Sequence, residues 1–142
     1  MPESDSWDSC EEIEVLVHRY VFESEAVPVT AVLRYRTADP FAVTMEFLGT
    51  DRAPVVKWTF SRDLLLEGIN HACGEGDIRV WPMCGPTGTR LCILLVPSDR
   101  SALMTTPLAE IVSWLKRTTE LVPPGTESDL IDWSALRNIM LP

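Results

Sequence analysis

The segment AVLRYRTADPFAVTMEFL, residues 31–48, predicts two β-strands joined by a tight turn. On both sides of residues 37–40, large apolar residues occupy every second position, and a period of two is typical of a strand with one buried face. At the turn, the Asp39 side chain can accept hydrogen bonds from nearby backbone amides, and Pro40 keeps Asp39 out of the α region. The two predicted inner faces hold Val29, Ala31, Leu33 and Tyr35, then Phe41, Val43, Met45 and Phe47.

Further elements are predicted on both sides of this segment. Residues 13–22 form a predicted strand before it, and alternating apolar residues mark a fourth strand up to Phe60. Ser61 is placed to cap a short helix over residues 62–67, which Gly68 would end in a left-handed conformation. The first predicted half of the fold therefore covers residues 13–68.

A second half, residues 76–118, repeats the order of strands followed by a helix. The continuously apolar residues 91–96 predict a central strand, with a shorter strand at 101–105. Thr106 is the predicted N-cap of a helix whose apolar stripe is Leu108, Ile111, Val112 and Leu115. The two halves together predict an α+β protein dominated by antiparallel strands.

Composition excludes several classes of protein. The chain has 142 residues, of which 46% are hydrophobic and 23% charged, and this fits one globular domain. No apolar run approaches the roughly 18 residues of a membrane span, and no signal peptide is recognisable. We therefore expect a cytoplasmic protein without membrane insertion. The formal net charge of −9 is concentrated in residues 1–14, which hold six acids and no base.

Both ends of the chain differ from the middle. Residues 1–12 are acidic and without period, which predicts a disordered arm, whereas residues 13–142 are expected to form a single domain. That domain ends in a tail, residues 128–142, with large apolar residues at near-helical spacing: Leu130, Trp133, Leu136 and Met140. An amphipathic segment of this kind must bury its stripe, either on its own body or on a neighbouring subunit.

Several motifs resemble those of the SsgA-like sporulation and cell-division proteins of actinobacteria. Residues 33–43, LRYRTADPFAV, are similar to the signature LRY-x-TADPYAV, and residues 58–68, WTFSRDLLLEG, to W-x-F-x-RDLL-x-EG. Residues 76–82, GDIRVWP, resemble GDVRVWP, while LKRT at 115–118 and VPPGTE at 122–127 resemble FLKRT…VPPGTE. The motifs keep their order and separations over residues 13–130, as in an SsgB-like member.

The resemblance implies a fold, a function and partners. The family fold is similar to that of Whirly-type and kinetoplastid guide-RNA-binding proteins: two antiparallel β-sheets packed across each other, with helices after each half, assembled as a homo-oligomer and expected to be a trimer. SsgB-like members help to place the tubulin-like division protein FtsZ at future septa, together with another SsgA-like protein. We therefore expect a non-enzymatic scaffold without a cofactor, concentrated at division septa.

Catalytic chemistry has little support in the sequence. His18 lies between apolar residues of a predicted strand and His71 lies in a loop, and no G-x-S-x-G elbow accompanies them. The pairs His71-x-Cys73 and Pro82-x-Cys84 lack the glutamate and the second cysteine of a zinc deaminase. We expect neither a catalytic residue nor a metal site.

Single-stranded nucleic acid is the alternative ligand. Arg34 shares an outer strand face with Arg36, and Arg79 shares one with Trp81, which would place a cation beside a stacking ring. A solvated face, or an arginine paired with an aspartate such as Asp77, is favoured over this. A groove that follows a phosphate backbone needs several uncompensated cations, and this chain is acidic.

The family motifs supply the candidates for partner binding. Arg62 and Asp63 permit two interpretations, a helix cap with a surface ion pair or an exposed charged epitope beside Trp58, and both expect Arg62 to point outward. The sequence does not separate the two. The full set of candidates is Arg34, Asp39, Trp58, Arg62, Asp63, Asp77, Arg79 and Trp81.

Overall fold

The computed structural model describes residues 8–22, 25–96 and 101–131. This part of the chain forms eight β-strands, two α-helices and one 3-10 helix. In chain order they are β1 (Cys10–Phe22), β2 (Glu25–Arg36), β3 (Asp39–Leu48), β4 (Pro54–Ser61), α1 (Arg62–Gly68), β5 (Cys73–Glu75), β6 (Ile78–Gly85), β7 (Gly88–Leu95), β8 (Ala102–Pro107), α2 (Leu108–Leu121) and the 3-10 helix η2 (Glu127–Leu130).

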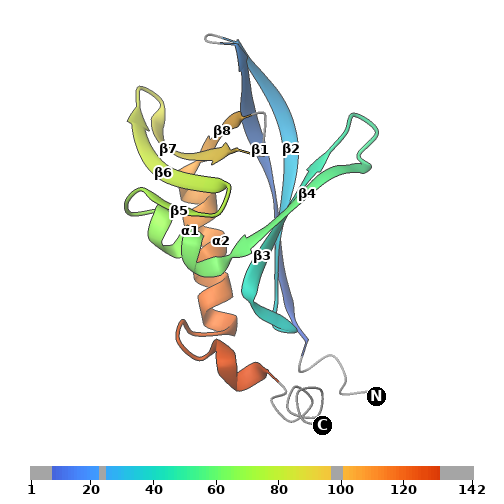
Figure 1. Cartoon of the computed structure of the whole chain (residues 1–142), viewed down its shortest axis with the longest axis vertical. Coiled ribbons are helices and arrows are strands. Elements are labelled where there is room, and N and C mark those ends of the chain that lie inside the picture. Colours follow the sequence, from blue (N-terminus) through green and yellow to red (C-terminus); the bar gives the residue numbers. More distant parts are fainter. Residues whose placement is uncertain (1–7, 23–24, 97–100, 132–142) are drawn as a thin grey trace.

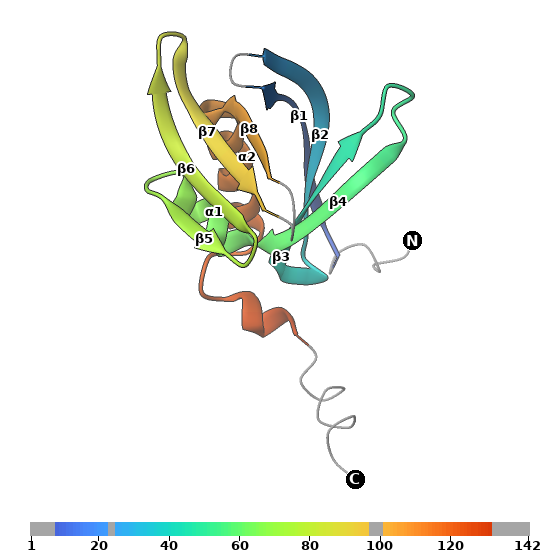
Figure 2. The same ribbon diagram turned by 45° about the horizontal axis from the view of Figure 1, so that its top comes forward.

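All eight strands belong to one antiparallel sheet with the order β4-β3-β2-β1-β8-β7-β6-β5. Two meanders, β1–β4 and β5–β8, join where β1 pairs with β8 through His18 to Tyr20 and Leu103 to Thr105. The sheet curls strongly, so that the two meanders rise on either side of a shared inner face (Figures 1 and 2).

The expected arrangement of two sheets packed across each other, similar to the Whirly and guide-RNA-binding fold, is therefore wrong. The two halves are continuous because three residue pairs join β1 to β8, as in His18 opposite Thr105. The pairing of the first strand with the last could not be predicted from the sequence, because periodicity indicates local structure and not which distant strands pair.

The strands predicted from residues 31–48 are confirmed. In the β2–β3 pair, Leu33 lies opposite Met45 and Ala31 opposite Phe47, and all four side chains are buried. Phe41, predicted to face inward, is exposed instead, beside the place where the pairing register shifts between Tyr35 and Arg36.

β1 begins earlier than the predicted start at residue 13. Cys10 pairs with Arg36 of β2, and Glu12 pairs with Arg34, so the end of the predicted acidic arm belongs to the sheet. The acids are accommodated because their carboxylates reach arginines on the neighbouring strand, as Glu12 does with Arg34. The first part of the predicted arm, residues 1–7, lies outside the described residues.

Both helices lie against the inner face of the sheet. Helix α1 contacts β3 and β6, and α2 contacts β1 and β7, so each helix bridges the two meanders (Figure 1). Their buried side chains join those of the inner sheet face in one hydrophobic core, to which the helices contribute Leu64, Leu65, Ile111, Trp114 and Leu115. Burial of each such leucine or isoleucine stabilises the fold by roughly 1.5–3 kcal/mol.

The ends of the helices only partly follow the predictions. The Ser61 Oγ accepts a hydrogen bond from the Leu64 amide at 3.1 Å, which confirms the predicted cap of α1. Gly68 does not adopt the predicted left-handed conformation. A Cβ at this position would lie 2.1 Å from Cγ2 of Val80, so glycine is required because α1 packs closely on β6. Thr106 belongs to β8, and Pro107 takes the N-cap position of α2.

Within the described ranges, no helix combines the length and the apolar character that crossing a bilayer would require.

Candidate partner-binding site

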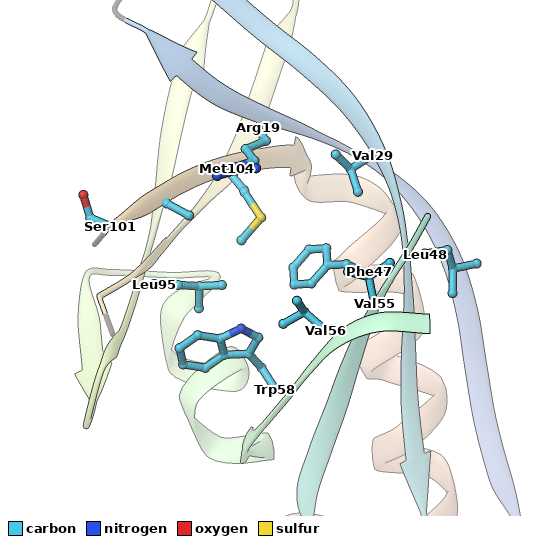
Figure 3. A pocket seen from close by; sticks show the side chains of 11 residues that line it. Arg19, Val29, Phe47, Leu48, Val55, Val56, Trp58, Leu95, Ser101 and Met104 are labelled. Atoms are coloured by element: carbon cyan, nitrogen blue, oxygen red, sulfur yellow. The ribbon is translucent and has the colours of Figure 1, made fainter. Parts of the chain in front are cut away.

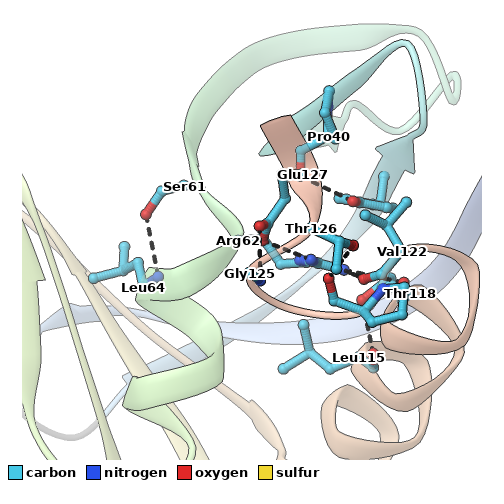
Figure 4. A network of polar contacts seen from close by, with 12 residues as sticks. Pro40, Ser61, Arg62, Leu64, Leu115, Thr118, Val122, Gly125, Thr126 and Glu127 are labelled. Atoms are coloured by element: carbon cyan, nitrogen blue, oxygen red, sulfur yellow. Dashed lines mark hydrogen bonds and ion pairs between the residues drawn. The ribbon is translucent and has the colours of Figure 1, made fainter. Parts of the chain in front are cut away.

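Arg62 is a fully buried charge at the first position of α1. Its Nη2 donates to Oε2 of Glu127 at 2.8 Å, and its Nη1 donates to the carbonyl oxygens of Thr118 and Val122 at 3.0 and 2.8 Å (Figure 4). The guanidinium lies 4.7 Å from the centre of the Tyr35 ring. One side chain therefore ties α1 to β2, to the end of α2 and to η2.

The prediction of an outward-pointing Arg62 is wrong. A guanidinium can be buried here because a carboxylate and two carbonyl oxygens at the negative end of the α2 dipole receive it. The Arg62 hydrogen bond holds the pKa of the Glu127 carboxyl below its usual range, with help from the Gly125 amide, which donates to Oε1 at 2.8 Å. Burial raises the pKa of Tyr35. This cluster stabilises the fold and is closed to a partner.

Three motif acids remain on the surface. Asp39 begins β3, Asp63 follows Arg62 in α1, and Asp77 precedes β6, and all three side chains are exposed. None of them forms an ion pair with another described residue. Their charges are therefore available to a partner, in contrast to the charge of Arg62.

The arginines of β2 are neutralised within the fold. Arg34 forms ion pairs with Glu12 of β1 and Glu46 of β3, which raise its pKa. Arg36 pairs with Asp8 at 2.7 Å. These strand positions were predicted correctly as an outer face, but the cations already have carboxylate partners.

Arg79 and Trp81 share one face of β6, as predicted. The Arg79 side chain is exposed, and the Trp81 side chain is half-buried. Arg79 forms no ion pair with a described residue, so the suggested pairing with Asp77 is not found. The structure does not bring this arginine together with Arg34, because β6 and β2 are separated in the sheet by β7, β8 and β1.

An apolar groove occupies the part of the inner sheet face that the helices leave uncovered. It has a volume of about 400 Å³. The side chains of Phe47, Val56, Trp58, Leu95 and Met104 lie around it, drawn from strands of both meanders (Figure 3). The described residues that line it are Arg19, Val29, Phe47, Leu48, Val55, Val56, Trp58, Leu95, Ser101, Ala102 and Met104.

Of the predicted site residues that the structure describes, only Trp58 lies in this groove. Sequence reasoning missed the other lining residues because they come from six strands that meet only in the folded sheet. One signal was present: Val55 and Val56 are consecutive valines in a strand that otherwise alternates, so one of them could not face the core. Both are exposed, Val55 by 69% and Val56 by 45%.

The histidines and cysteines do not form a cluster. His71 is exposed in the loop after α1, and His18 lies on β1 beside Arg90, whose Nη2 is 3.1 Å from Nδ1 of His18. Cys73 donates to the Leu64 carbonyl oxygen at 3.2 Å. Among the described residues, no three histidine, cysteine, aspartate or glutamate side chains are grouped so as to hold a metal ion.

The predicted C-terminal contacts lie mostly outside the described residues. Of the four stripe residues only Leu130 is described, at the end of η2, where its side chain is 48% exposed. Trp133, Leu136 and Met140 lie in the undescribed part of the chain.

Comparison with known proteins identifies the family. The family model described as "Streptomyces sporulation and cell division protein, SsgA" matches residues 29–127. The chain belongs to the SsgA family. It is 46% identical over 110 residues to the sporulation-specific cell division protein SsgB of Streptomyces coelicolor, and the alignment covers 77% of this chain and 80% of that relative. It is 43% identical over 110 residues to SsgB of Frankia casuarinae, covering 77% and 76%.

Solved SsgA-family structures share the fold. The SsgA-like sporulation-specific cell division protein of Thermobifida fusca aligns with a TM-score of 0.84 at 35% identity, over 99% of this chain and 100% of that one. A structure of Streptomyces coelicolor SsgB, reported with mutations that correlate to longitudinal cell division during sporulation, aligns with a TM-score of 0.82 at 38% identity, covering 88% and 98%. These likenesses support a role in cell division and sporulation.

Proposed function

We propose that this SsgA-family chain acts without catalysis, as a homo-oligomeric scaffold that recruits FtsZ and another SsgA-like protein to the future septum. The relatives' role in sporulation-specific cell division supports the setting. The expected trimer would present three copies of one modest surface to a polymer, and such repeated contacts bind far more tightly than one contact alone.

The observation that carries the proposal is the division of the motif charges between core and surface. Arg62 is buried and paired with Glu127, whereas Asp39, Asp63 and Asp77 are exposed and form no ion pair with a described residue. Charges that the fold does not use are suited to contact with a partner, where they favour association and partner choice. Asp63 is the strongest candidate because Ser61 and the buried Arg62 hold it in one position at the start of α1.

Co-sedimentation with FtsZ tests the recruitment. The full chain is expected to pellet with GTP-assembled FtsZ and to stay in the supernatant without it. The variant Asp63→Lys should weaken co-pelleting, whereas Asp51→Lys, at an exposed acid in the β3–β4 turn, should not. A wild-type chain that is monomeric at micromolar concentration and never pellets with FtsZ would overturn the proposal. A fluorescent fusion that fails to form bands at septa would remove its cellular part.

The nucleic-acid alternative is disfavoured because Arg34 and Arg36 are neutralised by carboxylates. It predicts binding to single strands that weakens steeply with added salt and is lost in Arg34→Glu combined with Arg79→Glu. Fluorescence anisotropy at low salt is expected to show no binding.

A further inference from the structure

The inner-face groove is an open apolar surface that reaches one edge of the sheet. β4 is the terminal strand in the sheet order, and it contributes the exposed Val55 and Val56 to the groove. An exposed apolar edge strand promotes pairing with another chain. A volume of about 400 Å³ is sufficient for several large side chains.

The C-terminal segment, residues 128–142, has the matching chemistry. Leu130 begins its apolar stripe and is half-exposed on the body of the molecule. Among the described residues that line the groove, Arg19 is the one charged side chain, and it forms no ion pair with another described residue. The segment contains two acids, Asp129 and Asp132, and one base, Arg137, so its net charge is opposite in sign to that of Arg19.

If it is helical, the segment cannot carry its stripe to the far end of the groove of its own chain, at Val56 and Phe47. η2 is tied through Glu127 to Arg62 beside Pro40, at the start of β3 (Figure 4). The groove extends from Trp58 to its far end at Val56 and Phe47, and Phe47 is about 23 Å further along β3 than Pro40 at ~3.3 Å per residue. A helix from Leu130 to Met140 would extend only about 15 Å.

We propose that the groove binds the C-terminal segment, residues 128–142, of a second copy of this chain, with Trp133, Leu136 and Met140 seated against Val56, Trp58 and Met104. This inference rests on the homo-oligomeric part of the proposed function and names the surface through which the subunits would contact each other. Each copy carries one groove and one segment, so head-to-tail exchange closes into a ring when the rotation between copies permits it, as in a trimer.

Paired variants of the full chain test the contact by sedimentation-velocity ultracentrifugation at micromolar concentration. Val56→Asp places a charge in the groove, and Leu136→Asp places one on the stripe. Each is expected to weaken self-association by about tenfold or more, because the aspartate cannot be desolvated in an apolar contact. The matched controls are Val112→Asp, at a similarly exposed valine on α2, and Asn138→Asp on the segment, and both should assemble like the wild type.

A mixing experiment separates a neighbour's groove from the chain's own. Val56→Asp keeps an intact segment and Leu136→Asp keeps an intact groove, so two differently tagged variants should co-purify when mixed, although each alone is monomeric. Binding within one chain predicts no recovery on mixing, and that result would overturn the proposal.

Two further outcomes are decisive. If the wild type assembles and both single variants assemble equally well, the groove contact is refuted while the scaffold proposal stands. If the wild type is monomeric, both fail together. Thermal unfolding by circular dichroism confirms that each variant is folded, and Val55→Glu, at a side chain already 69% exposed, replaces Val56→Asp if that variant does not fold.

Discussion

Nη2 of Arg62 lies 2.8 Å from Oε2 of Glu127, with side chains 1% and 7% exposed, although 65 positions separate the two residues in the chain. This ion pair joins the first helix to the C-terminal end of the described fold. The arrangement depends on both partners, since a charge that loses its partner inside a protein is costly to keep there.

Removing one partner is expected to be severe. Glu127→Gln leaves Arg62 buried without a counter-charge and should lower the free energy of unfolding by about 3–5 kcal/mol. Urea unfolding monitored by circular dichroism measures this. The matched control is Glu14→Gln, whose partner Arg52 is on the surface, and it should shift the unfolding midpoint little. Equal shifts for the two variants would contradict a dominant role for the buried pair.

The same pair predicts an acid dependence of stability. The folded-state pKa of Glu127 is depressed, first by the hydrogen bond from Arg62, so its stabilisation is fully present at neutral pH. It should decline once the pH falls below the ordinary glutamate pKa of about 4.3, and disappear below the folded pKa. Urea midpoints measured from pH 7 downward should therefore fall more steeply for the wild type than for Glu127→Gln. Parallel curves would show that another group causes the acid loss.

Gly68 is expected to tolerate no side chain. The added methyl group of Gly68→Ala would meet Cγ2 of Val80 at 2.1 Å, and relief requires α1 to move away from β6. Overpacking of this kind should cost about 1–3 kcal/mol in urea unfolding. In the double variant Gly68→Ala with Val80→Ala, the smaller side chain at position 80 leaves room for the new methyl group. The double variant should therefore lose less free energy of unfolding than the sum of the two single variants, which a double-mutant cycle measures. Strict additivity would show that the two positions do not collide.

The thiols are expected to differ widely in reactivity. Cys92 is only 2% exposed and burial raises its pKa, whereas Cys84 is exposed on β6. Because the thiolate is the reactive form, a disulfide reagent should label Cys84 quickly and Cys92 only after unfolding. Mass spectrometry of peptides from a timed reaction identifies the sites. Cys84→Ser is the control, and rapid labelling of Cys92 in the native chain would show that β7 opens.

Much of the local structure could be predicted because its causes are local. The alternation in residues 31–48 indicated β2 and β3, and the Ser61 cap is made within one helical turn. The turn between β6 and β7 is equally local, with Gly85 opposite Gly88. Family membership followed from motifs that are contiguous in the chain.

The candidate site could be predicted only in part. Asp63 was recognised as a surface acid at the start of α1, but its neighbour Arg62 was placed on the wrong side of the helix. Neighbouring side chains on a helix point about 100° apart, so one can be buried while the next is exposed. A charged side chain is buried only when partners, here from distant parts of the chain, compensate its charge. The Glu127 carboxylate and the α2 carbonyl oxygens that do so come from the far end of the chain.

Residue order alone was enough to define the strands, the turns and the family, since each depends on neighbours a few positions apart. The tertiary structure decided the rest: one curled sheet whose two meanders are joined by the β1–β8 pairing, the buried position of Arg62, and an apolar groove assembled from both meanders. Those features depend on contacts between distant residues, and the free energy of such contacts comes from burial and charge pairing that no local pattern records.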